Sequence, residues 1–314
     1  MNRRLLVVAA TLGILALAAA YLLVQPSPFT VGIQPLSINH PMMYAIDGGF
    51  FSKQRLRPKV QLFGSANDAL DAVLGGSVFI DATIPIQNIA AIQQQQPGAL
   101  GIAAVLLSDN EHPLDYLVAP SSSPIKSALD LSGKTIVVFP GSYSETVTRL
   151  AFAKLGVTNI NFIKRSPSDM PQALQTGQAD AGVLYDPIAT EATVQGWGRI
   201  IERAFWENHL LPVMVVGGYA YNMADAKKHP ERARQALAAL DAAITDAQRN
   251  PREAKMAMKR YVHAADATIA LLPSARIELA DQIDPRLIDL TLDLYANSGI
   301  IPKRIDLRPL LRHP

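Results

Sequence analysis

A glycine and three hydroxyl-bearing residues, Gly141-Ser142-Tyr143-Ser144, stand between a short apolar run and a helical pattern. The apolar run, residues 135–139, predicts a buried parallel strand, and apolar residues on one helical face then continue to about Leu155. The turn would present free backbone N–H groups at the edge of an α/β sheet where ligands bind. Such a turn suits a ligand rich in hydrogen-bond acceptors. An ordinary strand–turn–helix without a ligand explains the same pattern, and both interpretations stand at this point.

The first turn of this helix carries a second polar signal. Ser142 and Glu145 have the spacing of a capping box, in which the glutamate side chain returns to the backbone of the N-cap residue. We expect this pairing. A carboxylate there would disfavour a simple anion at the helix N-terminus. It would better suit a zwitterion such as an aminosulfonate, or a neutral heterocycle stacked on Tyr143 or Tyr185.

Other predicted strands also end in polar loops, which could point into one cleft. These loops are rich in hydroxyls, amides and tyrosine and carry no cationic side chain, which suits binding without chemistry. Thr83 has a structural alternative as the end of a strand, and Asp186 has one as the cap of a helix that begins at Pro187. We predict that the ligand-binding residues are Ser37, Asn39, Thr83, Gly141, Ser142, Tyr143, Ser144 and Asp186.

Signatures of catalysis are missing from the sequence. It contains no H-E-x-x-H, no phosphate-binding P-loop, no G-x-G-x-x-G and no G-x-S-x-G. None of its six histidines has metal-ligand spacing, and the absence of cysteine excludes disulfides, thiolate ligands and a lipidated N-terminal cysteine. We therefore expect no enzyme activity, no cofactor and no metal. The net charge of +2 comes without a basic patch, so we expect no nucleic-acid partner.

The N-terminus indicates the compartment. Arg3 and Arg4 precede an uncharged run over residues 5–24, which is long enough to span a bilayer. Ala18-x-Ala20 offers a cleavage site for a signal peptide, although the apolar run continues past it. A cleaved signal peptide and an uncleaved anchor both place the rest of the chain outside the cytoplasm. We expect a periplasmic protein, either soluble after cleavage or anchored to the inner membrane by residues 5–24.

Predicted strands and helices alternate along much of the chain, which indicates βαβ units and parallel sheets. Residues 72–82 resemble residues 173–181, because each stretch reads as a helix end, a glycine turn and a strand led by Asp-Ala. This echo suggests two similar α/β lobes that face a cleft. From about Asp225 onward the pattern is mainly helical.

The chain resembles the periplasmic solute-binding proteins of ABC importers, in the branch of aliphatic-sulfonate, taurine, nitrate and thiamine-pyrimidine-precursor binders. This resemblance implies an α/β, two-lobed periplasmic binding protein fold of type II with the ligand cleft between the lobes. It implies a signal peptide or anchor at 1–26, lobe 1 at 27–118 and 213–314, and lobe 2 at 119–212. The motifs that carry it are Pro41-Met42-Met43-Tyr44-Ala45, Gly48-Gly49-Phe50-Phe51, Asp130-Leu131-Ser132-Gly133-Lys134, Gly141-Ser142 and Tyr185-Asp186-Pro187.

The resemblance implies a protein that captures a small organic solute, similar to a sulfonate, taurine or nitrate, by closure of the lobes. The protein would be a monomer that delivers this ligand to an ABC permease in the inner membrane. The alternative ligand is a thiamine-precursor pyrimidine or a similar neutral heterocycle. Alternatives of another class are a membrane-tethered sensor and an enzyme like the thiamine-pyrimidine synthases. The family often has Trp-Glu-Pro where this chain has Tyr185-Asp186-Pro187, which changes the expected pocket size.

Overall fold

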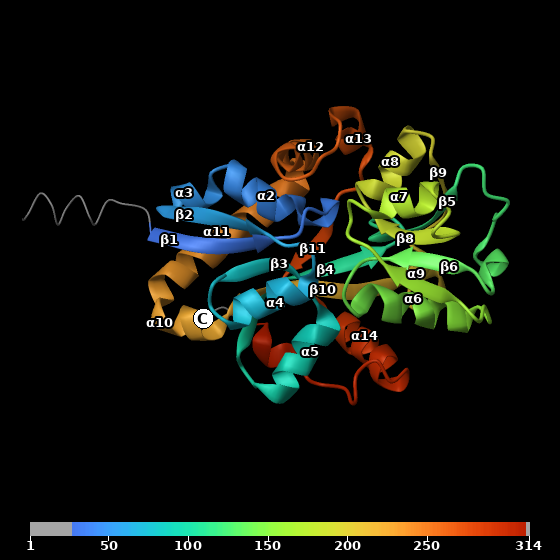
Figure 1. The fold of residues 1–314 in the computed structure, drawn as a ribbon. Helices are drawn as coiled ribbons and strands as arrows, with labels where there is room; N and C mark the ends of the chain where they lie inside the picture. Colours follow the sequence, from blue (N-terminus) through green and yellow to red (C-terminus); the bar gives the residue numbers. More distant parts are fainter. Residues whose placement is uncertain (1–26, 312–314) are drawn as a thin grey trace, which may run out of the picture.

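The computed structural model describes residues 27–311, which form two α/β bodies side by side (Figure 1). The apolar segment at residues 5–24, predicted to be a signal peptide or an anchor, lies outside the described residues. Within residues 27–311, no helix has the length and apolar character that a membrane crossing requires.

The first body is built on a six-stranded mixed sheet with the order β11-β4-β10-β3-β1-β2. β1 runs parallel to β2 and β3, whereas β10 is antiparallel to β3 and β4, and β11 is antiparallel to β4. The strands are β1 (Ser27–Ile33), β2 (Leu56–Leu62), β3 (Ile80–Pro85), β4 (Leu100–Asp109), β10 (Val213–Asn222) and β11 (Arg276–Leu279). Every residue of β3 and β4 is buried, as expected of central strands with helices on both faces.

The second body has a five-stranded sheet with the order β7-β6-β8-β5-β9. β6 is parallel to β7 and β8, and β5 is antiparallel to β8 and β9. The strands are β5 (Asp115–Pro120), β6 (Thr135–Val138), β7 (Asn161–Lys164), β8 (Ala181–Tyr185) and β9 (Gly198–Arg203). The helices of this body are α6 (Tyr143–Lys154), α7 (Met170–Gln175), α8 (Ile188–Val194) and α9 (Phe205–His209), preceded by the short 3-10 helix η2 (Ala128–Leu131).

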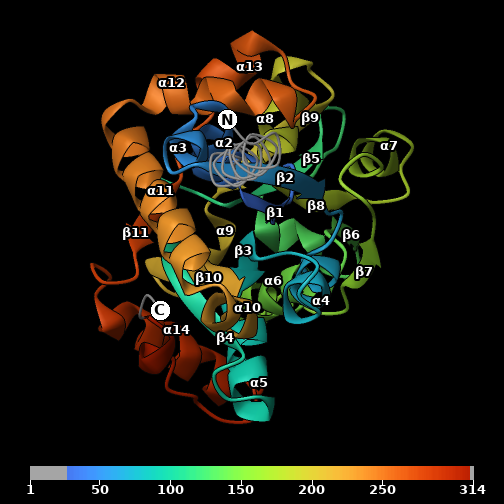
Figure 2. The same cartoon turned by 90° about the vertical axis from the view of Figure 1, so that its left-hand side faces the viewer.

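The first body carries most of the helices. α2 and α3 lie above its sheet in Figure 1, and α4 and α5 lie below it. The long α11 packs against α2 and α3 (Figure 2). These helices are α2 (His40–Asp47), α3 (Phe50–Lys53), α4 (Ala66–Leu74), α5 (Ile86–Gln95), α10 (Met223–Lys228), α11 (Pro230–Arg249), α12 (Pro251–Met256), α13 (Asp266–Leu271) and α14 (Pro285–Asn297). Three 3-10 turns complete the body: η1 (Ser37–Asn39), η3 (Ala257–Arg260) and η4 (Arg308–Leu310).

The two bodies are joined by two passages of the chain. The first passage lies at residues 110–114, between β4 and β5, and the chain returns ahead of β10, which begins at Val213. The predicted lobe boundary at 118/119 falls inside β5, and this strand pairs with β8 and β9 of the second sheet. The boundary is therefore too late, because the sequence pattern shows a strand but not the sheet that it joins.

The echo between residues 72–82 and 173–181 corresponds to equivalent pieces of the two bodies. In each, a helix ends before a glycine with positive φ, 75° at Gly76 and 73° at Gly177, and a strand follows. β3 then pairs in parallel with β1, and β8 pairs in parallel with β6. The helix, the glycine turn and the parallel strand pair therefore occur in the same arrangement in both bodies.

Candidate functional site

A cavity of about 630 Å³, counting the part open to solvent, lies between the two bodies. Its walls come from the residues at and just after the ends of β1, β2, β3, β6 and β8, which is the edge where α/β sheets bind ligands. The first body contributes Gln34, Pro35, Leu36, Ile38, Phe63, Gly64, Ser65, Ala66, Thr83, Pro85 and Val216, the first passage contributes Leu114, and the second body contributes Phe139, Pro140, Tyr143, Ser144, Pro167 and Tyr185.

Three helices begin at this cavity. Ser65 and Ala66 stand at the start of α4, Pro85 is the N-cap residue of α5, and Tyr143 is the first residue of α6. The first N–H groups of a helix have no partner within it, and they carry the positive end of its dipole. α4 and α5 belong to the first body and α6 to the second, so helix starts border the cavity from both sides. At α4, however, the Ser65 hydroxyl already accepts a hydrogen bond from the Asp68 N–H, and the Asp68 carboxylate lies in the first turn. No lysine or arginine among residues 27–311 borders the cavity.

The start of α6 differs from the prediction. Ser142 is the N-cap residue, but its side chain accepts no backbone hydrogen bond, and its φ and ψ of −92° and −26° are helical rather than extended. Glu145 turns away and pairs with Arg149 at 2.7 Å and with Lys164 at 3.0 Å. The predicted capping box is therefore wrong. The hydrogen bond from Arg149 holds the pKa of Glu145 below its usual value, and the two cations offset its charge.

Aromatic rings form the wall of the second body. Phe139 and Tyr185 are stacked with their centroids 4.0 Å apart, and Trp206 meets the rings of Tyr143 and Tyr185 edge-on. The oxygen atoms of Tyr143, Ser144 and Tyr185 are buried and form no well-aligned hydrogen bond within the described part of the chain. The Tyr185 hydroxyl faces that of Ser144, and the Tyr143 hydroxyl faces that of Tyr295, so a ligand would compete with these weak contacts.

A closed network of hydrogen bonds supports the wall of the first body. Asp81 Oδ1 accepts hydrogen bonds from Gln34 Nε2 at 3.1 Å and from the Thr83 backbone N–H at 2.9 Å. Asn39 Nδ2 donates to the Gln34 carbonyl at 2.8 Å, and the Thr83 hydroxyl donates to Asn39 Oδ1. Asp81 and Asn39 are completely buried, and burial raises the pKa of Asp81 to about 6. The network fixes Gln34 and Thr83, which border the cavity.

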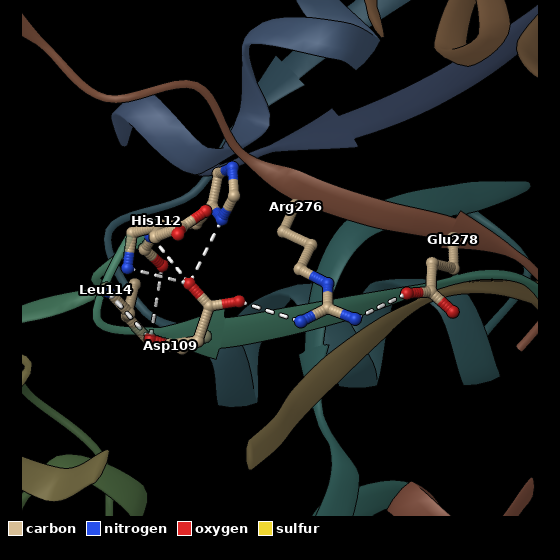
Figure 3. Close-up of polar contacts among 7 residues, drawn as sticks. Asp109, His112, Leu114, Arg276 and Glu278 are labelled. Atoms are coloured by element: carbon tan, nitrogen blue, oxygen red, sulfur yellow. Dashed lines mark hydrogen bonds and ion pairs between the residues drawn. The ribbon is translucent and has the colours of Figure 1, made fainter. Parts of the chain in front are cut away.

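A second polar network shapes the first passage (Figure 3). Asp109, the last residue of β4, accepts hydrogen bonds from the backbone N–H of His112 at 2.7 Å and from its Nδ1 at 3.0 Å. Arg276 of β11 binds the other oxygen of Asp109 at 2.7 Å and reaches Glu278 at 2.9 Å. Burial raises the pKa of Asp109, but the bonds from Arg276 and His112 outweigh it and hold that pKa below its usual value. Leu114, at the end of this passage, borders the cavity.

Two buried acids lie beside the passages, Asp115 at the start of β5 and Glu207 in α9. Asp115 Oδ2 accepts a hydrogen bond from the Trp206 backbone N–H at 3.3 Å. Burial raises the pKa of both carboxyl groups, and the charge of Glu207 raises that of Asp115 further. Within residues 27–311, no group of three or more histidine, cysteine, aspartate or glutamate side chains is arranged to hold a metal ion.

Three of the eight predicted site residues, Thr83, Tyr143 and Ser144, border the cavity. Asn39 lies behind Thr83, and Gly141, with a φ of +95°, forms the turn before α6. Ser37, Ser142 and Asp186 also do not border the cavity.

Two of the predicted residues outside the cavity wall, Ser37 and Asp186, form a hydrogen bond between the two bodies. The Ser37 N–H donates to the Asp186 carbonyl at 3.0 Å. The Asp186 carboxylate accepts hydrogen bonds from the N–H and hydroxyl of Thr190 in α8, as its structural alternative predicts.

Several wall residues were missed, notably Gln34, Phe63, Ser65, Phe139 and Tyr185. As a ligand contact, Tyr185 enters the sequence analysis only as a ring on which a heterocycle could stack, and Gln34 is not among the predicted residues. The signal that finds most of the missed residues is position rather than polarity, since four of them end a strand or directly follow one.

A protein-family model described as "NMT1/THI5 like" matches residues 38–254. A putative aliphatic sulfonates-binding protein of Escherichia coli (strain K12) is 23% identical over 302 residues, which cover 92% of this chain and 90% of that protein. The alkanesulfonate-binding protein SsuA from Xanthomonas axonopodis pv. citri, bound to MOPS, superposes with a TM-score of 0.72 at 19% identity over 91% of this chain and 98% of that one. The desulfurization enzyme DSZB superposes with a TM-score of 0.65 at 12% identity over 90% of this chain and 96% of that one.

Proposed function

The chain belongs to the NMT1/THI5-like family, and on that premise we propose that it is the extracytoplasmic solute-binding protein of an ABC importer. It has the fold of the periplasmic binding proteins, with the candidate cavity between its two bodies. The ligand we propose is a small organic sulfonate, taken up in the periplasm and passed to a permease in the inner membrane. The relatives named for sulfonate binding support this choice.

The observation that carries the ligand class is the convergence of helix N-termini on the cavity. The starts of α4 and α5 border it from one side and the start of α6 borders it from the other. A sulfonate has three acceptor oxygens and one negative charge, which match the N–H groups and positive dipole ends at the starts of α5 and α6, where no side chain caps the helix. Ser144 Oγ, which is buried without a well-aligned partner, would donate to one of these oxygens.

The charge of Glu145 does not oppose an anion at this site. The carboxylate is turned toward Arg149 and Lys164 and caps no N–H group of the helix. The argument for a zwitterion that rested on this residue therefore loses its basis. A singly charged organic anion fits the start of α6 as well as a zwitterion does.

The rest of the cavity suits an apolar group on the same ligand. Its walls are mainly hydrocarbon and aromatic, and they include Phe63, Leu114, Phe139 and Tyr185. Ligand pockets of this kind combine apolar walls with a few polar groups that fix orientation. We propose that the sulfonate lies at the helix starts and that the alkyl or aryl part packs against these side chains.

Closure of the two bodies would complete the site. Within residues 27–311 the chain passes between the sheets at residues 110–114 and again ahead of β10, and we propose that the bodies rotate about these two passages. The division of the chain into two lobes remains our proposal, with the first boundary moved to residues 110–114. Closure would bury the ligand and present both bodies to a permease.

A neutral heterocycle such as a thiamine-precursor pyrimidine is the second candidate. One observation favours it, because no cationic side chain among the described residues borders the cavity. The hydroxyls of Tyr143 and Tyr185 could then bind ring nitrogens, with Phe139 below the ring of Tyr185. This candidate predicts that binding does not depend on a negative charge.

We propose binding without turnover, although the fold by itself leaves catalysis open, since the desulfurization enzyme DSZB shares it. The sequence has no cysteine, so a thiol nucleophile is excluded. Among residues 27–311, those that border the cavity carry hydroxyl and amide groups but include no histidine or acid that could transfer a proton directly to a ligand.

A thermal-shift panel tests the ligand class. The purified protein is melted with alkane-1-sulfonates, taurine, nitrate, thiamine and its pyrimidine precursor in phosphate or Tris, because MOPS is itself a sulfonate. A ligand at a hundred times its Kd stabilises the folded state by about 2.7 kcal/mol. We expect this with an alkanesulfonate. A shift with the pyrimidine alone would replace our ligand by the second candidate, and no shift with any compound would contradict both.

A further inference from the structure

Asp81 lies directly beneath the cavity wall of the first body. One of its carboxyl oxygens, Oδ1, holds both Gln34 and Thr83, which border the cavity. The other oxygen, Oδ2, is fully buried and has no hydrogen-bond partner among residues 27–311. An unpaired buried carboxylate oxygen is costly, so its retention needs an explanation.

The sequence makes room for this carboxyl group. Asp81 pairs across the sheet with Gly32, and a Cβ atom at residue 32 would lie 2.4 Å from Asp81 Oδ2. In the echo between the two bodies, Asp81 corresponds to Asp180, whose Oδ2 accepts a hydrogen bond from the Thr135 N–H and whose side chain is partly exposed. The first body therefore buries completely an acid whose counterpart in the second body reaches solvent.

No positive charge compensates Asp81 from the elements that pack against β3. The strand β10 contributes the phenols Tyr219 and Tyr221, of which Tyr219 interacts with Asp81 electrostatically. The charged residues of α4, Asp68 and Asp71, are acidic and exposed. β1 and α5, which complete the surroundings, carry no charged residue.

We propose that Asp81 is a positioning residue that sets the charge of the anion site: it takes up a proton from solvent when an anion binds beside Gln34 and Thr83. The proton would reside on Oδ2, which leaves Oδ1 free to hold the two wall groups. No bond of the ligand is formed or broken. The inference rests on the proposed function, because it requires an anionic ligand.

The direction of the pH dependence follows from the free protein. Burial raises the pKa of Asp81 to about 6, so at pH 7 to 8 this carboxyl group is mostly ionised. A bound anion raises the pKa further, and the bound state then holds more protons than the free state. Affinity therefore falls as pH rises above 6, by up to about tenfold per pH unit, until the pKa of the bound state is passed.

Isothermal titration calorimetry of the full-length protein with hexane-1-sulfonate tests this linkage. Titrations at pH 7 in phosphate and in imidazole, which differ in ionisation enthalpy, give the number of protons taken up. We expect about half a proton to one proton for the wild type, and correspondingly about two- to tenfold weaker binding at pH 8 than at pH 7. Asp81→Asn keeps an oxygen for Gln34 and Thr83 but has no charge, so uptake and pH dependence should vanish.

Two matched variants assign the proton. Asp180→Asn changes an acid that accepts a backbone hydrogen bond just before β8, and it should retain the wild-type uptake. Glu207→Gln changes the buried acid of α9 and should retain it as well. If Asp81→Asn does not fold, carboxyl ¹³C NMR of aspartate-labelled protein in which Asp115 and Asp186 are changed to asparagine shows whether Asp81 gains the proton, because these two are the other buried aspartates whose pKa is raised among residues 27–311.

The outcomes separate this inference from the proposed function. Equal observed binding enthalpies in phosphate and in imidazole, with binding intact, would mean that no proton is taken up. This result would overturn the role of Asp81 and leave the proposed function standing. Uptake that survives in Asp81→Asn and disappears in Glu207→Gln would also overturn it. An absence of binding by any sulfonate would overturn the proposed function and the inference together.

Discussion

Arg149 Nη2 lies 2.7 Å from Glu145 Oε1, one turn along α6, and this pair leaves the start of the helix without a capping side chain. The second oxygen of Glu145 is held by Lys164 of β7. The first turn of α6 therefore turns its acid away and keeps its N–H groups for other partners. Since α5 also begins at the cavity without a capping side chain, this relationship supports the anionic ligand that we propose.

Ser144 and Ser142 form a matched pair for the binding site. Ser144 borders the cavity with its Oγ buried, whereas Ser142 does not border it and caps nothing with its side chain. We expect Ser144→Ala to weaken binding of hexane-1-sulfonate by about 10- to 100-fold, since hydrogen bonds to charged groups contribute roughly 1.5–3 kcal/mol. Ser142→Ala should change Kd less than twofold. Calorimetry checks both, and equal losses in the two variants would refute the placement.

The apolar walls predict a dependence on chain length. Each methylene buried from water contributes about 0.8 kcal/mol, which is roughly fourfold in affinity. From methanesulfonate to hexane-1-sulfonate we expect the Kd to fall two- to fourfold for each added carbon until the cavity is filled. A series of titrations in phosphate buffer measures this slope. An affinity that stays constant or falls as the alkyl chain grows longer would mean that the alkyl tail remains in water.

Arg276 should contribute to stability through the first passage. It is part-buried and bonds Asp109, which in turn fixes the backbone of residues 111 and 112. Arg276→Met is expected to lower the free energy of unfolding by about 1–2 kcal/mol. Arg304→Met, which removes a more exposed arginine paired with Asp289 and Asp293, should cost less than about 0.5 kcal/mol. Urea denaturation compares them, and equal effects would show that the passage does not depend on this contact.

His40 gives the fold a sensitivity to acid. Its Nδ1 donates to the Ser37 carbonyl at 2.8 Å, and burial lowers the pKa of the ring from 6.5 to about 4. Between these values the unfolded chain binds a proton at His40 that the folded state does not, so stability falls as pH falls. Lowering the pH across this whole range would reduce the free energy of unfolding by roughly 3 kcal/mol.

The effect of His40 is isolated by a difference measurement, because Asp81 contributes with the opposite sign in the same range. The free energy of unfolding is measured from pH 7 to pH 4 for the wild type, for His40→Asn and for His263→Asn, which changes an exposed histidine. We expect a smaller decline in His40→Asn than in the wild type, and no difference for His263→Asn. Parallel curves for all three proteins would remove His40 as the cause.

Local patterns in the sequence predicted most elements of the fold. The apolar run at residues 135–139 became β6, and the helical face after it became α6. The glycines at 76 and 177 take the positive φ that ends a helix before the next strand. These features depend on neighbours in the chain, which is why they can be read from it.

The features that were predicted wrongly depend on residues far apart in the chain. β5 has the pattern of any buried strand, and its place in the second sheet is set by pairing with β8 and β9, more than 60 residues later. The capping box at Ser142 and Glu145 has the right spacing, but Lys164 from the distant strand β7 binds the glutamate instead, together with Arg149 of the same helix. Phe63, which borders the cavity, has no polar signal that would single it out.

The negative charge of the ligand is the central claim, and one comparison of affinities tests it directly. Hexane-1-sulfonate and the neutral hexane-1-sulfonamide share tail and shape but differ in charge. Titration of the wild-type protein with each, in phosphate at pH 7, should show the sulfonate binding at least about 100-fold tighter, as expected for an anion held at several helix N-termini. Equal affinities, or tighter binding of the sulfonamide, would contradict the account and favour a neutral ligand.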